Sequence, residues 1–102
     1  MKNPQNLFTA LADPTRRDVF ERLTRDGPAS ASKLAARLPI SRQAIQKHLA
    51  VLDVAGLVTR SSVGREVNYS AEPAALSDMT DWAEKVDAQW QKRLDRLRRS
   101  LD

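Results

Sequence analysis

The sequence of 102 residues predicts a mainly α-helical fold with one small β-hairpin, a winged helix-turn-helix in a single domain. Three observations carry this prediction. Two short stretches with apolar residues at helical spacing are joined by a turn of about three residues, 39–41. An extended segment with a single glycine follows at once over 57–71. One apolar stripe then recurs every three or four residues from 73 to 101.

Residues 3–25 predict two N-terminal helices. Apolar residues at i, i+1 and i+4 favour a short amphipathic helix over 3–11. Asp13 suits the N-cap of the next helix, and Pro14 suits its first position because no N–H is needed there. This second helix should end just before Gly27, which we expect in the left-handed conformation.

The next two helices form the predicted helix-turn-helix. Ser30 or Ser32 caps a third, short helix, and Pro39 breaks it. Ser41 then caps a fourth helix, which Gly56 ends in the left-handed conformation. Helices this short, joined by so tight a turn, are typical of DNA-binding helix-turn-helix units.

The wing and the last helix complete the domain. A strand begins over 57–59, its antiparallel partner covers 67–70, and the turn over 61–66 has a basic tip. From Pro73 onward the chain predicts one long helix, of which residues 77–101 alone would measure roughly 37 Å. Such a helix outreaches a small domain and must pack on something extra. The expected segments of domain 1–102 are N-terminal helices 3–25, a helix-turn-helix over 30–56, a wing over 57–71 and a C-terminal dimerisation helix over 73–101.

The charge distribution favours a nucleic-acid partner. The net charge is only +4, but six basic residues stand between Gly27 and Arg65 against one acid, Asp53. A basic middle segment on a mixed background is typical of a DNA-binding surface, although scattered solvated charges would give the same count. Cysteine is absent, and no apolar run approaches the roughly 20 residues that span a bilayer. We therefore expect a cytoplasmic protein with no membrane partner.

The polar face of the fourth helix carries the candidate base contacts. Arg42 can reach the paired acceptors of guanine, while Gln43 and Gln46 can pair with adenine directly or through water. Lys47, one turn deeper than Gln43, better suits a phosphate. The alternative is that these four side chains form an ordinary solvated face. Ser41 is interpreted as the N-cap, and a phosphate contact would be additional.

Four other polar residues have two interpretations each. Arg65 at the wing tip can enter a minor groove or meet the DNA backbone, or it is a solvated hairpin charge. Arg60 can contact phosphate or solvent. His48, the only histidine, either packs half-buried between helices or meets a phosphate, and alone it makes a poor zinc site. Tyr69 packs the wing on the core or stacks on a base.

An aromatic-rich line on the last helix predicts a dimer interface. Trp82, Val86 and Trp90 lie at i, i+4 and i+8, and large aromatic side chains contribute much buried area. The line could instead border a small-molecule pocket. The basic end over 92–99 is interpreted as a solvated terminus, with a second nucleic-acid contact as the alternative. The residues expected at the interface are Leu7, Phe8, Leu11, Met79, Trp82, Val86, Trp90 and Leu94.

Three motifs together resemble one family. ALADPTRRDVFERL, then SRQAIQKHLAVLDVAGLVTR, then GREVNYS are similar in order and separation to the ArsR family of bacterial winged-helix repressors. The resemblance implies a homodimer that binds a palindromic double-stranded DNA operator and represses transcription, often of its own gene. It also implies that the first and last helices build the dimer interface.

Departures from the family pattern indicate a cysteine-free, metal-independent subgroup with no cofactor. Metal-sensing members carry cysteines in the third helix, here SASKLAARL, or histidines paired with carboxylates on the last helix; this chain has neither. Carboxylates without histidine or cysteine suit only hard cations. We interpret the four carboxylates of the last helix as a solvated face instead: Asp78, Asp81, Glu84 and Asp87. Gln46 replaces a small hydroxyl residue of many members, so operator preference does not carry over. An unidentified inducer is the remaining partner to be expected.

Two other function classes were weighed. A winged-helix module that binds only protein is the alternative, but the basic middle segment argues against it, because protein-interface cores are depleted in lysine. An enzyme is excluded, since the sole histidine lies in the groove-facing helix without a nucleophile. The three glycines, moreover, form no phosphate-binding loop.

Overall fold

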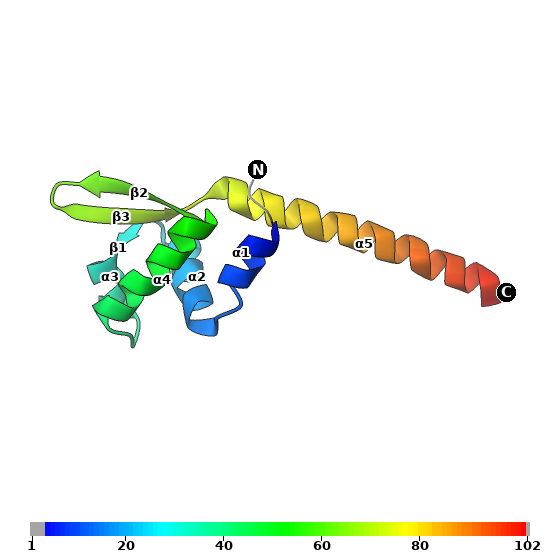
Figure 1. Cartoon of the computed structure of the whole chain (residues 1–102), viewed down its shortest axis with the longest axis horizontal. Helices are drawn as coiled ribbons and strands as arrows, with labels where there is room; N and C mark the ends of the chain where they lie inside the picture. Colours follow the sequence, from blue (N-terminus) through cyan, green and yellow to red (C-terminus); the bar gives the residue numbers. More distant parts are fainter. Residues whose placement is uncertain (1–3, 102) are drawn as a thin grey trace.

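The structure, a computed structural model, describes residues 4–101 and is a mainly helical winged helix-turn-helix, as the sequence predicts. Figure 1 shows α1 to α4 gathered beneath a hairpin, while α5 projects away from them and gives the molecule a length of 66 Å. The expected start of the first helix at Asn3 lies outside the described residues. The elements are α1 Pro4–Ala10, α2 Pro14–Asp26, β1 Ala29–Ser30, α3 Ala31–Arg37, α4 Arg42–Ala55, β2 Val58–Val63, β3 Glu66–Ala71 and α5 Pro73–Leu101.

The connection between α1 and α2 is held by side chains of the second helix. Asp13 caps α2 by accepting a hydrogen bond from the backbone N–H of Arg16 at 2.9 Å. This bond lowers the pKa of the Asp13 carboxyl, because it stabilises the ionised form. The guanidinium of Arg16 donates to the carbonyl of Ala10, and that of Arg17 to the carbonyl of Leu11, each at 3.0 Å. The two guanidinium groups of α2 thus donate hydrogen bonds to backbone carbonyls at the end of α1, where a helix leaves its last carbonyls without a partner.

Two glycine predictions have different outcomes. Gly56 ends α4 with φ 84° and ψ 17°, so the left-handed cap is confirmed. Gly27 has a positive φ of 89°, but its ψ is −173°, so the predicted left-handed cap is wrong. The extended ψ directs the chain straight into β1 instead of turning it back over the helix end.

Ser30, and not Ser32, caps α3, since its hydroxyl accepts a hydrogen bond from the backbone N–H of Lys33 at 3.1 Å.

The sheet has three strands, where the sequence predicted two. β1 pairs antiparallel with β3, Ala29 opposite Tyr69, which gives the order β1-β3-β2. A strand of two residues is too short for any alternating pattern, so only the pairing reveals it. The hairpin turn is also tighter than the predicted 61–66, because Val63 still pairs with Glu66. Gly64, with φ 63°, and Arg65 alone form the tip.

The core lies between α1, α2, α3, α4 and the base of the sheet. α5 contributes one buried residue, Ala75, while Met79 is packed partly against the core. Every residue from 81 to 93 is exposed. Leu7, which the sequence places among the interface residues, is fully buried within its own chain. The long outer part of α5 has no covering element in residues 4–101.

Candidate nucleic-acid interface

The two faces of α4 have opposite character. Ile45, Leu49 and Leu52 recur at helical spacing and are completely buried. Packing of these three residues on α2 and α3 fixes the rotation of α4 about its axis, so the opposite face must point outward. The candidate contact residues of this helix are all exposed: Ser41, Arg42, Gln43, Gln46 and Lys47.

The start of α4 is set by a capping hydroxyl. The Oγ of Ser41 accepts a hydrogen bond from the backbone N–H of Ala44 at 3.1 Å. α3 ends at Arg37, so the turn covers residues 38–41 and α4 begins at Arg42. Arg42 and Gln43 therefore lie in the first turn of α4, the part of a recognition helix that meets base edges in helix-turn-helix proteins.

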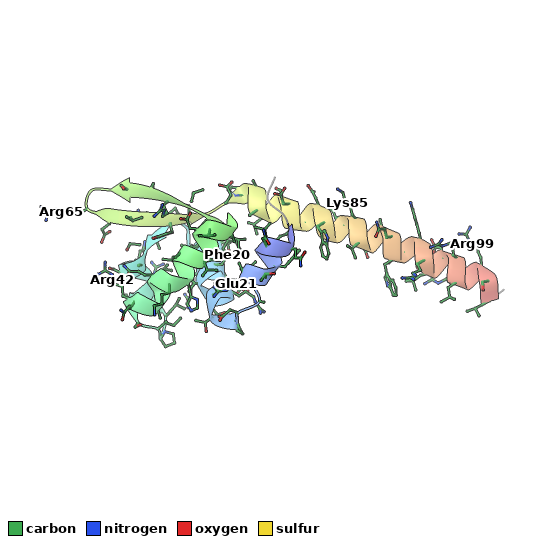
Figure 2. The ribbon with its side chains drawn as sticks, in the orientation of Figure 1. Phe20, Glu21, Arg42, Arg65, Lys85 and Arg99 are labelled. Atoms are coloured by element: carbon green, nitrogen blue, oxygen red, sulfur yellow. The ribbon has the colours of Figure 1, made fainter. Side chains whose placement is uncertain are left out.

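Tertiary folding brings the helix face and the wing together. Arg42 and Gln46 of α4 line one hollow of about 180 Å³ with Arg65 of the wing. Figure 2 shows Arg42 and Arg65 at the end of the molecule that is remote from the projecting α5. Two guanidinium groups at one concavity make a positive site for phosphate or for base edges. Residues more than twenty positions apart in sequence thus form one surface.

Six lining residues of this hollow are not among the contact residues predicted from sequence, although base stacking was one interpretation of Tyr69. They are Ser30, Ala31 and Ser32 at the start of α3, and Glu66, Val67 and Tyr69 of β3. Of the residues not considered from sequence, Glu66 alone could have been found there, because it lies beside Arg65 at the wing tip. Tyr69 is half-buried and packs against the core, which favours the packing interpretation over base stacking. His48 is also half-buried, as the packing interpretation expects.

Arg60 is separate from this hollow. Its Nε lies 3.3 Å from the Oδ2 of Asp53 at the end of α4, so an ion pair connects the base of the wing to α4. Arg60 borders a second groove with Val58 and Ser62, on a different part of the wing. The interaction is partly exposed and contributes little stability by itself. A phosphate contact by Arg60 stays a prediction.

The remaining interface candidates lie on or near α5. The rings of Phe8 and Trp82 are 5.1 Å apart at an angle of 56°, which attaches α1 to α5 within one chain. Leu11 is half-buried against the core. Val86 and Trp90 are exposed, with 53% of Trp90 accessible. Four of the eight predicted interface residues, Phe8, Trp82, Val86 and Trp90, are thus exposed in the described chain.

The Ser41→Ala variant is expected to lose about 1 kcal/mol of stability, because one helix N–H loses its acceptor. For a domain of this size that corresponds to a fall in Tm of roughly 4–8 °C. Ser41→Asn is the matched control, since asparagine caps equally well and should restore Tm. Thermal melts and DNA titrations of both variants check this. A Ser41→Asn protein with normal Tm but weakened DNA binding would show that the hydroxyl also contacts phosphate.

Across 4–101, no three His, Cys, Asp or Glu side chains gather where they could hold a metal ion. None of the helices in that part of the chain is both long and apolar enough to cross a bilayer.

Comparison with known proteins finds similarity along most of the chain. A family model described as a helix-turn-helix domain matches residues 11–61. The transcriptional regulator Rv2034 of Mycobacterium tuberculosis is 41% identical over 76 residues, which are 74% of this chain and 70% of that protein. The transcriptional repressor SdpR of Bacillus subtilis is 32% identical over 76% of this chain and 84% of its own length. A solved ArsR-like transcriptional regulator from Rhodococcus sp. RHA1 is 42% identical, with a TM-score of 0.83 over 92% of this chain and 88% of that one.

Proposed function

The chain belongs to the ArsR family of helix-turn-helix transcriptional regulators, and on this premise we propose that it is a dimeric repressor of a palindromic DNA operator. One such operator would lie upstream of its own gene. Repression is the activity in the name of the relative SdpR. A regulator of this kind acts on DNA in the cytoplasm.

The observation that carries the proposal is the hollow shared by α4 and the wing. Arg42, Gln46 and Arg65 converge there from two elements, and all three are exposed to a ligand as large as a duplex. An α-helix fits the major groove of DNA, and a basic wing tip beside it fits the adjacent backbone or minor groove. A protein-binding surface would not need this combination of guanidinium and amide groups.

The proposed roles follow from the chemistry of each side chain. Arg42, Gln43 and Gln46 read base edges, because each offers hydrogen bonds that fit guanine or adenine in the major groove. Lys47 and Arg65 contact the phosphate backbone and supply most of the affinity. Arg60 can reach phosphate only by leaving its ion pair with Asp53.

Two copies of the chain are needed to read a palindrome. A twofold-symmetric dimer presents two identical α4 helices to two half-sites. The exposed apolar residues of α5 support this assembly, because Trp82, Val86 and Trp90 lie together on a helix that its own domain does not cover. Phe8, stacked on Trp82, borders the same region.

Fluorescence anisotropy on two labelled duplexes tests the proposal. One duplex has the DNA immediately upstream of the reading frame, and the other is a shuffled copy. We expect tighter binding to the upstream duplex, and we expect the affinity to fall steeply with salt because phosphate contacts release counterions. Equal and weak binding to both duplexes would contradict the proposal and favour a module that binds only protein.

A further inference from the structure

An apolar groove of about 460 Å³ lies between α1 and the C-terminal half of α4. Figure 1 shows the two helices next to each other, and their residues are in contact. The volume is within the range of about 300–1,000 Å³ that is typical of small-molecule sites. The groove is separate from the hollow of α4 and the wing, since the two share no lining residue. Its apolar lining residues are Ala10 of α1 and Ala50, Val51, Val54 and Ala55 of α4.

The groove exposes an apolar strip of α4 that the core does not use. In the described chain, Val51 is 39% exposed and Val54 is 82% exposed. The two residues are three positions apart and are therefore neighbours on the helix surface. An apolar ligand that covers this strip releases the water in contact with it, and this release favours binding.

Arg16 of α2 is the charged residue among the described residues that line the groove. Its Nη1 donates a hydrogen bond to the carbonyl of Ala10 at 3.0 Å. Its Nε is buried and has no hydrogen-bond acceptor within residues 4–101. No carboxylate oxygen of the described residues lies within 4.0 Å of the guanidinium, and Asp13 accepts from the backbone N–H of Arg16 instead. The positive charge therefore has no counterion in that part of the chain.

A guanidinium without a counterion can bind a carboxylate. The group is always charged in proteins and has five N–H donors. Nε and Nη2 form one edge, whose N–H groups match the two oxygens of a carboxylate. In Arg16 this edge has no acceptor among the described residues, because the bond to Ala10 uses Nη1 alone. A buried donor without an acceptor costs stability, so a ligand that supplies the acceptor is bound favourably.

We propose that the groove binds a small organic monoanion, a carboxylate attached to an apolar chain. The carboxylate pairs with the Nε–Nη2 edge of Arg16, and the apolar chain covers Val51 and Val54. This site goes beyond the proposed function, because the DNA contacts proposed for Arg42 and Gln46 lie on the first two turns of α4, at its other end.

The lining residues disfavour other classes of small ligand. An inorganic phosphate or sulfate has no apolar part and would leave Val51 and Val54 in contact with water. A wholly apolar ligand would leave Arg16 without a counterion in a less polar environment, which is unfavourable for a charge. The hydroxyl of Thr9 already donates to the carbonyl of Gln5 at 2.8 Å, so it offers no donor to a polar ligand. A single charge beside an apolar strip fits an amphipathic monoanion.

Titration of octanoate into the whole chain, without DNA, tests the proposal. Binding is followed by calorimetry and by the NMR shifts of the backbone amides. We expect saturable binding, with the largest shifts at Val51, Val54 and their neighbours on α4 and at Arg16. Octylammonium has the same apolar chain with the opposite charge, and acetate has the carboxylate without the chain. Both control ligands should bind much more weakly than octanoate.

Two variants and a matched control separate the charge from the apolar strip. Arg16→Gln should weaken octanoate binding by about 10- to 100-fold, the contribution of hydrogen bonds to a charged group. Arg17→Gln is the control, because Arg17 also donates to backbone carbonyls near the end of α1 but does not line the groove. Val54→Asp keeps the fold, since Val54 is 82% exposed, and should abolish binding because its carboxylate repels the ligand. This variant tests the site even if Arg16→Gln is unstable.

Four results would overturn the proposal. They are no saturable binding of octanoate, equal binding of octylammonium, shifts centred on the exposed residues of α5 instead of α4, and equal losses from Arg16→Gln and Arg17→Gln. Because the titration contains no DNA, its result does not depend on operator recognition. Failure of this site and failure of the proposed function are therefore separately observable.

Discussion

Sequence preference is expected to disappear when Arg42 and Gln46 are both replaced by alanine. Each bidentate side chain–base pair contributes about 1–3 kcal/mol of discrimination, roughly 5- to 150-fold per position. The double variant should therefore bind the upstream and shuffled duplexes with the same weak affinity. The remaining binding should still depend on salt, because the double variant keeps Lys47 and Arg65, for which we propose phosphate contacts.

The fold of this variant should be intact. Both side chains are exposed, and the buried residues of α4 that hold it in place are untouched. Arg25→Ala is the matched control, since it removes an exposed arginine of α2 that does not line the hollow. Titrations of both proteins on both duplexes, with sedimentation to confirm the dimer, decide the outcome. A double variant that retains its preference would show that the base contacts lie elsewhere.

Trp90→Ala is expected to dissociate the dimer. Trp90 is 53% exposed in the single chain, so its loss removes little from the core of the domain. In the proposed dimer Trp90 lies in the interface, and the substitution acts twice because both subunits carry it. Truncating a buried tryptophan typically costs about 3–5 kcal/mol, so the dissociation constant should rise by more than 100-fold.

Sedimentation equilibrium over a range of concentrations measures this change. Lys92→Ala is the control, because Lys92 lies on α5 but away from the apolar stripe. It should leave the dimer mass unchanged. A Trp90→Ala protein with the mass and melting temperature of the unaltered chain would remove Trp90 from the interface. Loss of operator affinity should accompany dissociation, since a monomer reads only one half-site.

The relation between sequence and structure differs from element to element. Ser41 and Gly56 mark the ends of α4 through local chemistry, a capping hydroxyl and a residue free to adopt positive φ. These signals act within one turn of helix and are readable without knowledge of the rest of the chain. The stripe of α5 is of the same kind, since helical spacing alone places Trp90 and its neighbours on one face.

Other features depend on which distant segments meet. β1 exists only because residues 29 and 30 find β3, forty positions along the chain. The spacing of Leu7 suits an intermolecular face and the core equally well, and its complete burial in its own chain places it in the core. Arg60 was grouped with the DNA contacts by charge, whereas the fold pairs it with Asp53. Sequence patterns specify that a side chain is apolar or charged, but not which surface it will meet.

The sequence by itself therefore determined the helices, the caps at Asp13, Ser41 and Gly56, the wing hairpin and the polar face of α4, because each depends on interactions between near neighbours. The tertiary structure alone decided that Arg42, Gln46 and Arg65 share one hollow, that Leu7 belongs to the core, and that α5 is uncovered beyond the contact of Trp82 with Phe8. These properties arise from packing between segments far apart in the chain. Their geometry is set only when the buried faces of α2, α3 and α4 close on one another.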